Sequence, residues 1–153
     1  MAGCAPLSLP TSVPGGAFAA YDTGYELLNP GIYNFAYFNS TDTMVGFEFV
    51  RASAGVSLPY TGAITTDNYA ACQNCILYGE GCTSFTPMLT CTRRYLGQAG
   101  TAAVSSATES TTSGSFIGTV TGVTFREWNF MTDSAVAGGR CYTLAAASYS
   151  VSW

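Results

Sequence analysis

Apolar and polar residues alternate along much of the chain, and a period of two predicts β-strands. The clearest run covers residues 115–130, with the sequence SFIGTVTGVTFREWNF. Every second residue of this run is expected to share one face of the strand: Ile117, Thr119, Thr121, Val123 and Phe125. Gly118 and Gly122 fall on the other face, where glycine indicates close packing or a bend. The run therefore predicts a long strand that packs closely or bends at its glycines.

Further runs of the same kind predict that this strand belongs to a sheet. Residues 31–38 and 44–51 are joined by a short polar link, which predicts a hairpin. Residues 141–153 alternate again, so that Tyr149, Val151 and Trp153 are expected on one face and serines on the other. Shorter strands are predicted within residues 55–66, 76–78, 91–97 and 100–105.

These runs amount to about eight to nine strands, and no amphipathic helix is evident. Regularly spaced short strands with Gly, Ser and Asn turns predict an all-β antiparallel sandwich in a single domain over residues 21–153. Residues 1–20 hold three prolines and no charge, which predicts an extended N-terminal arm. An eight-stranded transmembrane barrel is the alternative, but six cysteines and the lack of long apolar faces disfavour it.

Charge is scarce, and this scarcity excludes several classes of function. Five Arg and nine Asp or Glu give 14 charged residues among 153, which is 9% against about 25% in an ordinary domain. There is no Lys and no His. Catalysis by a His-based triad, His metal sites and Walker-type phosphate binding are therefore excluded. A net charge of −4 supplies no basic footprint for nucleic acid, and no apolar run is long enough for a membrane-spanning helix.

An even number of cysteines in a small, charge-poor chain predicts disulfides and an oxidising compartment. The preferred pairing joins Cys72 to Cys75 (or a local exchange of that pair), Cys82 to Cys91, and Cys4 to Cys141. Pro87 lies within the short 82–91 loop and eases its closure.

Three other roles for the cysteines stay open. Cys72, Cys75, Cys82 and Cys91 could ligate zinc, although only one CxxC knuckle is present. The same CxxC could be a redox centre, but no βαβ pattern surrounds it. The start Met1-Ala2-Gly3-Cys4 looks like the end of a bacterial lipoprotein signal, which would make Cys4 a lipid anchor.

Several short motifs resemble a known group of proteins. They are NYAAC at 68–72, CILY at 75–78, CTRRY at 91–95, GTVTGVTFRE at 118–127 and GGRCY at 138–142. Over about residues 30–145 the chain resembles the secreted, cysteine-containing β-domains of predicted surface lipoproteins that are common in myxobacteria. The resemblance implies export, a β fold and paired cysteines, and it implies no chemistry.

Carboxylates are the groups with which an enzyme of this composition would have to work. A carboxylate pair could run a glycosidase, and Glu80 and Asp67 are the best-placed candidates. Glu48 and Glu127 lie within strands, where a solvent-facing or an arginine-paired role is expected, with Arg51 and Arg126 close by in the sequence. No spacing singles out a pair, so we expect no catalytic site and no cofactor.

Other residues suit binding rather than chemistry. Tyrosine rings can stack on sugars, acidic loop residues can hold calcium, and Asn39-Ser40-Thr41 matches a glycosylation sequon. The tyrosines considered are Tyr33, Tyr37 and Tyr60, and the acidic residues are Asp42, Asp67 and Asp133. These acidic residues do not form a cluster in the sequence, so the hypothesis of a calcium site has no further support.

We expect an extracellular or cell-surface structural protein without catalysis, which assembles with copies of itself or with other surface components. A glycan- or surface-binding adhesion module is the alternative, and a carboxylate-based hydrolase is the third. The charge-free ends of the chain are the expected assembly elements. Their candidate residues are Pro6, Leu7, Leu9, Val13 and Phe18 in the arm, and Tyr149, Val151 and Trp153 at the C-terminal end.

Overall fold

The computed structural model describes residues 3–8, 12–13, 18–26, 32–39, 42–50, 57–64, 68–84, 90–108 and 110–153, with the backbone alone in β2, β3 and β4. Eleven strands and no helix are found in these ranges, which confirms the all-β prediction. The strands are β1 (Ala5–Pro6), β2 (Ser12–Val13), β3 (Phe18–Glu26), β4 (Ile32–Asn39), β5 (Met44–Val50), β6 (Tyr60–Ala63), β7 (Asn74–Ser84), β8 (Thr90–Ala107), β9 (Ser115–Asn129), β10 (Ser134–Ala135) and β11 (Cys141–Ser152).

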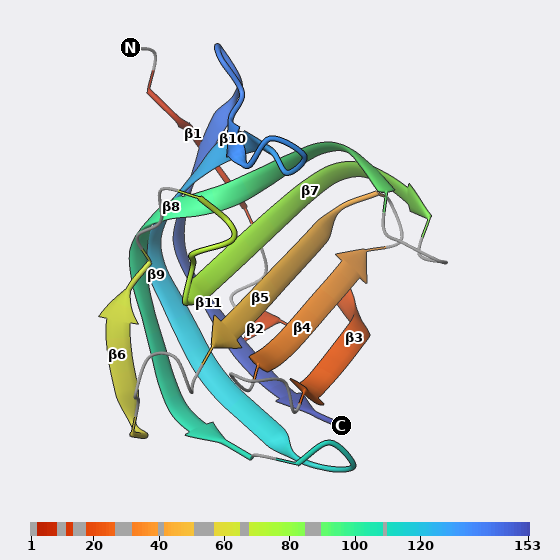
Figure 1. The fold of residues 1–153 in the computed structure, drawn as a ribbon, viewed down its shortest axis with the longest axis vertical. Helices are drawn as coiled ribbons and strands as arrows, with labels where there is room; N and C mark the ends of the chain where they lie inside the picture. Colours follow the sequence, from red (N-terminus) through yellow and green to blue (C-terminus); the bar gives the residue numbers. More distant parts are fainter. Residues whose placement is uncertain are drawn as a thin grey trace.

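The strands form one connected, strongly curved sheet in the order β1-β11-β9-β8-β7-β5-β4-β3, which we call the curled sheet (Figure 1). Short strands extend it: β10 pairs with β9, β2 with β11, and β6 with β8. The predicted hairpin is confirmed, since β4 and β5 pair antiparallel. Both β1 and β2 run parallel to β11. The expectation of a purely antiparallel sheet is therefore wrong, and the expected two-layer sandwich is not confirmed.

Parallel pairing follows from the path of the N-terminal arm. Ala5 lies opposite Tyr142, and Ser12 lies opposite Ser148, so the arm runs alongside β11 in the same direction. The next strand, β3, begins at Phe18, inside the segment expected to be an arm. It lies at the far end of the strand order and approaches β11 again because the sheet curls.

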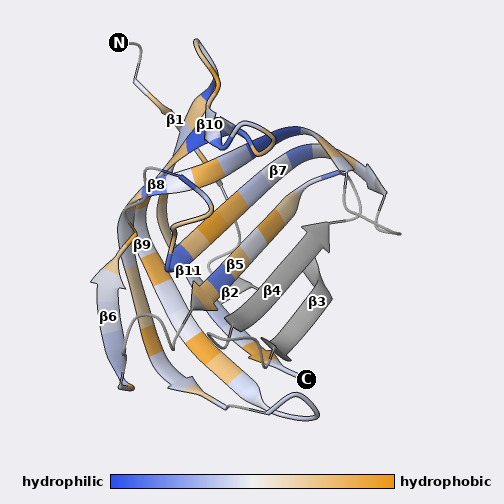
Figure 2. Ribbon diagram, viewed as in Figure 1, coloured by the Kyte–Doolittle hydropathy of each residue, from blue (hydrophilic) through white to orange (hydrophobic). Residues whose placement is uncertain are grey.

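Hydrophobic residues recur as separate bands along the strands of the curled sheet (Figure 2), and the core lies on its inner face. Phe47, Phe49, Phe116 and Tyr149 come from three strands, and their ring centroids lie 5.1–6.5 Å apart. Each of these side chains is at most 2% exposed. Burying a side chain of this size contributes about 1.5–3 kcal/mol. Val45, Phe47 and Phe49 of β5 are buried, and the predicted shared face of Tyr149 and Val151 is confirmed, because both are buried as well.

The prediction for the 115–130 strand is wrong in its second half. Ile117, Thr119 and Thr121 share an exposed outer face, whereas Val123 and Phe125 are completely buried on the inner face. The change occurs at Gly122, whose φ of 60° is readily adopted by glycine. Gly122 predicted a bend, and β9 bends there. The alternation of apolar and polar residues did not reveal that the inward-facing positions shift by one residue at this bend.

All three preferred cysteine pairs are disulfides in the structure. Cys4–Cys141 joins residues 137 positions apart and fastens the start of the arm to the first residue of β11. Cys82–Cys91 links the adjacent strands β7 and β8, and Cys72–Cys75 closes a short turn before β7. None of the described cysteines is free in this form, because all six are paired in these three disulfides.

We predict that Cys4–Cys141 stabilises the fold more than Cys82–Cys91. Loop-closure entropy alone gives roughly 5 kcal/mol for a separation of 137 residues and roughly 3 kcal/mol for 9 residues. The double variant C4A/C141A should therefore lose more unfolding free energy in urea than the matched control C82A/C91A. An equal or reversed order would contradict the role given to the long-range disulfide.

Candidate functional site

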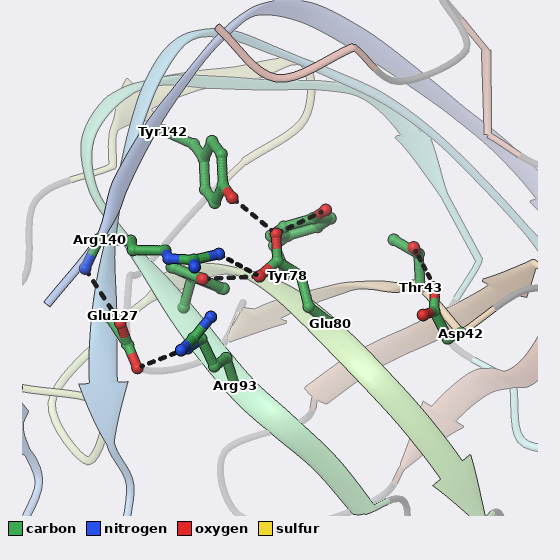
Figure 3. A network of polar contacts seen from close by, with 9 residues as sticks. Asp42, Thr43, Tyr78, Glu80, Arg93, Glu127, Arg140 and Tyr142 are labelled. Carbon is green, nitrogen blue, oxygen red and sulfur yellow. Dashed lines mark hydrogen bonds and ion pairs between the residues drawn. The ribbon is translucent and has the colours of Figure 1, made fainter. Parts of the chain in front are cut away.

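The most distinctive polar site is a carboxylate held by three tyrosines at one end of the inner face (Figure 3). The hydroxyls of Tyr142 and Tyr78 donate to Glu80 Oε1 over 2.7 and 3.4 Å. The hydroxyl of Tyr95 donates to Glu80 Oε2 over 2.8 Å. The guanidinium of Arg140 completes the set, with its Nη1 atom 4.0 Å from Oε2.

Strand geometry explains why these side chains meet. Tyr78 and Glu80 are two residues apart on β7, so both point to the inner face. Tyr95 lies directly opposite Tyr78 on β8. Tyr142 lies on β11, beyond Phe125 of β9. The three tyrosine rings pack against one another with centroids 5.2–5.7 Å apart, which leaves their hydroxyls converging on one carboxylate.

The surroundings keep Tyr78 and Tyr95 neutral. Burial, and next the charge of Glu80, raise the pKa of Tyr78 to about 12. Burial and the hydrogen bond to Glu80 raise the pKa of Tyr95 still further. A phenol in this environment donates a proton to a hydrogen bond and does not give it up at physiological pH.

A second carboxylate continues the network outward. Glu127 Oε1 lies 3.5 Å from Nε of Arg93, and Oε2 accepts a 3.0 Å hydrogen bond from the backbone N–H of Arg140. Arg140 thus contacts both carboxylates, with its backbone and its side chain. A hydrogen bond with the Tyr142 hydroxyl raises the pKa of the Arg140 guanidinium. Glu80 and Glu127 are linked in this way to two arginines.

On the outer face, a third carboxylate fastens two loops. Asp133 Oδ1 accepts from the backbone N–H of Tyr69 at 2.7 Å and from the Trp128 indole at 2.9 Å, and Oδ2 accepts from the backbone N–H of Ala70. These donors, Tyr69 first, hold the pKa of Asp133 below its usual value. The Tyr69 hydroxyl in turn donates to both oxygens of Glu48, and burial raises its pKa. The 68–73 turn is thereby held over β5 and β9.

Glu48, Glu80 and Asp133 thus accept hydrogen bonds from neutral donors, and two of the four arginines in the described ranges have a carboxylate within 4.0 Å. Within the described ranges, Arg94 and Arg126 have no carboxylate within 4.0 Å, and Arg140 reaches Glu80 only at that limit. The Arg94 guanidinium instead covers the ring of Phe130, 4.5 Å from its centroid. Only the side chain of Arg93 forms an ion pair shorter than 4.0 Å among these four.

Two of these arginines border a cavity of about 420 Å³ beside the loop between β10 and β11. The loop is fastened at both ends to β9, because Val136 donates to the Glu127 carbonyl and Glu127 donates to the Arg140 carbonyl. Gly138 has a φ of 68° and open space on its Cβ side. The cavity is lined by Arg126, Glu127, Ala135, Val136, Gly138, Gly139, Arg140 and Cys141.

The sequence candidates for catalysis are placed apart from one another. Glu80 lies in the tyrosine network, Glu48 lies on the outer face, and Asp67 is outside the described residues. The arginine expected beside Glu127 was Arg126, but its partner is Arg93 on β8. The tyrosine partners of Glu80 were missed, although the Tyr78-x-Glu80 spacing on one strand was a usable signal.

The binding candidates also divide. The Tyr60 ring is half-buried against Phe49, and its hydroxyl accepts from Asn74. Asp42 bonds with Thr43, and the described residues contain no group of three or more side chains suited to a metal ion. The remaining binding candidates have side chains outside the described set. They are Tyr33 and Tyr37, and Asn39, Ser40 and Thr41 of the sequon.

Four of the five assembly candidates whose side chains are described are packed inside this chain. Tyr149 and Val151 lie in the core, and Leu7 packs against it. The indole of Trp153 also packs there and donates to the Ser110 carbonyl. Pro6 is exposed. Leu9, Val13 and Phe18 have side chains outside the described set.

No protein-family model, curated protein or solved structure matches this chain. The described residues include no helix that is long and apolar enough to cross a membrane.

We predict that Glu80→Gln destabilises the fold by about 1–3 kcal/mol, because an amide cannot accept from three hydroxyls and balance Arg140 as a carboxylate does. Urea unfolding measures the loss. Tyr142→Phe, which removes one donor and keeps the ring, should cost less than Glu80→Gln. Unchanged stability in both variants would show that the network contributes nothing.

We also predict that stability falls as the pH rises above 10. The folded pKa of Tyr78 is about 12 and that of the unfolded chain is 10.0, so the unfolded state releases its proton first. The stabilisation is complete below pH 10 and is lost as the pH rises towards 12. Melting temperatures across this range measure it, and Tyr78→Phe should weaken the dependence. An unchanged dependence in that variant would contradict the assignment.

Proposed function

We propose that this chain is an exported, non-catalytic structural domain that associates with copies of itself through the outer face of β8, β9 and β11. The observation that carries the proposal is the chemistry of this face. Paired positions share a face of the sheet, so three rows of residues lie side by side there. They are Thr101, Ala103 and Ser106 on β8, Ile117, Thr119 and Thr121 on β9, and Ala146, Ser148 and Ser150 on β11.

This neutral outer face is suited to contact with a second copy. It has no charged residue, and most of its side chains are exposed, with Ile117 at 45%. A chain of net charge −4 repels its copies least where no charge is present. Small Thr, Ser and Ala side chains allow two sheet faces to approach closely and leave little rotamer entropy to lose.

Export is supported by the disulfides. Three disulfides in a 153-residue chain are consistent with an oxidising, extracellular environment. The resemblance of the sequence motifs to those of secreted β-domains also implies export.

The absence of catalysis is proposed from the state of Glu80. Both of its oxygens already accept hydrogen bonds, from the buried Tyr95 and the half-buried Tyr142, which makes it a poor proton acceptor for a substrate. Its role is then to join β7, β8 and β11 at one end of the core.

A ligand-binding module is the second candidate function. The cavity between Arg126 and Arg140 is the specific observation that favours it, because these guanidinium groups have few acceptors within the described chain.

We predict that the double substitution T119R/T121R weakens self-association by about tenfold or more, because association would remove unpaired guanidinium groups from water. Light scattering over a concentration series measures the association. The double substitution T111R/T112R adds the same charge in the exposed 110–113 loop and is the matched control.

Melting temperatures near that of the parent chain would show that both variants fold. A parent chain that stays monomeric at high concentration would overturn the proposed self-association. Equal weakening in both variants would show that net charge, and not the outer face, governs it.

A further inference from the structure

We infer that the cavity beside the β10–β11 loop binds an oxyanion, namely a carboxylate, sulfate or phosphate group of an extracellular ligand. This inference names the ligand chemistry of the second candidate function, and it does not depend on self-association. It is carried by the arginines at the cavity, by the local excess of positive charge over the nearby carboxylates, and by the open backbone of the loop.

The arginines are the first argument. Guanidinium groups are the preferred partners of carboxylate, sulfate and phosphate oxygens, which they bind through two parallel N–H bonds. Arg126 is exposed and, within the described part of the chain, has no ion-pair partner. Arg140 is 57% exposed and lies 4.0 Å from its nearest carboxylate. Two of only five cations in the protein therefore border one cavity of about 420 Å³.

The neighbouring carboxylates do not cancel this charge. Glu127 is paired with Arg93, and Glu80 is held by three tyrosine hydroxyls in addition to Arg140. Counting Arg93, Arg126 and Arg140 against Glu80 and Glu127 leaves a local charge of 3 − 2 = +1 on a chain of net charge −4. The site is thus a local positive spot on an acidic protein, which suits a single anionic group better than a long polyanion.

The loop backbone supplies room and rigidity. Gly138 has nothing within 4 Å on its Cβ side, so a ligand can approach the main chain there. Gly139 is tightly packed instead: a Cβ at this position would lie 2.9 Å from Glu127 Cβ, and its N–H donates to the Val136 carbonyl. Cys141 also borders the cavity, and its disulfide to Cys4 holds this part of the lining in place. The loop is therefore held in place before a ligand arrives.

The test titrates the disulfide-bonded protein with sodium sulfate, inorganic phosphate and glucuronate, each at constant ionic strength against chloride, while NMR follows the backbone amides. We expect saturable shifts at Gly138 and Gly139 with at least one of these anions, and the anion that binds most tightly identifies the source of the group. Arg126→Gln should weaken binding by about tenfold, as expected for a charge-assisted hydrogen bond pair. Arg94→Gln is the matched control, because Arg94 carries the same charge but does not line this cavity, and its guanidinium covers Phe130.

Shifts that are absent with all three anions would overturn the inference. Equal weakening by Arg126→Gln and Arg94→Gln would also overturn it, because it would reveal general electrostatic attraction. Arg140→Gln disturbs the Glu80 network, and Arg126→Gln avoids that complication because Arg126 has no such contact. A loss of binding in Arg126→Gln with an unchanged melting temperature would support the inference, whatever the oligomeric state of the chain.

Discussion

A paired bend in the two longest strands determines much of the architecture. Gly100 on β8 and Gly122 on β9 both have positive φ, and a Cβ at Gly100 would lie 2.9 Å from the Thr121 carbonyl oxygen. The residues that face inward change at this point in both strands. On β8 the buried residues include odd-numbered Tyr95 before the bend and even-numbered Ala102 after it, and on β9 they change from Val120 to Val123. Long strands can curl around one core only if such bends occur together, because an isolated shift would break the ladder between them.

This bend also marks where prediction from the sequence succeeds and where it stops. Alternation is a local property, so it identified β5, β9 and β11 and the inward side of Tyr149 correctly. It could not follow β9 through Gly122, because one extra residue inverts every later position. Parallel pairing of β1 and β2 with β11 depends on residues more than 130 positions apart, on which a local pattern carries no information. The cysteine pairs were inferred from proximity in sequence and from the two ends of the chain, and the long-range pair belongs to this same pairing of the arm with β11.

The polar site shows a similar division between local and distant information. Tyr78 and Glu80 could be placed together from their spacing, whereas Tyr95 and Tyr142 meet them only through the register of β8 and the curl that brings β11 close. As a result, Glu80 and Asp133 accept hydrogen bonds mainly from phenols, an indole and backbone N–H groups, and Arg126 is left without a carboxylate partner in the described part of the chain. Because the chain has so few charges, an arginine without a carboxylate partner is one of the few groups that can bind an anionic ligand.

The Cys4–Cys141 disulfide has a mechanical consequence. Tension applied between the two ends of this chain passes from Cys4 directly to Cys141 through the disulfide, so residues 5–140 form a closed loop that the force does not stretch. The force then acts only on the part of β11 after Cys141. This part would detach from β9 while the rest of the curled sheet is not extended. The disulfide thus limits how far the molecule can lengthen under load.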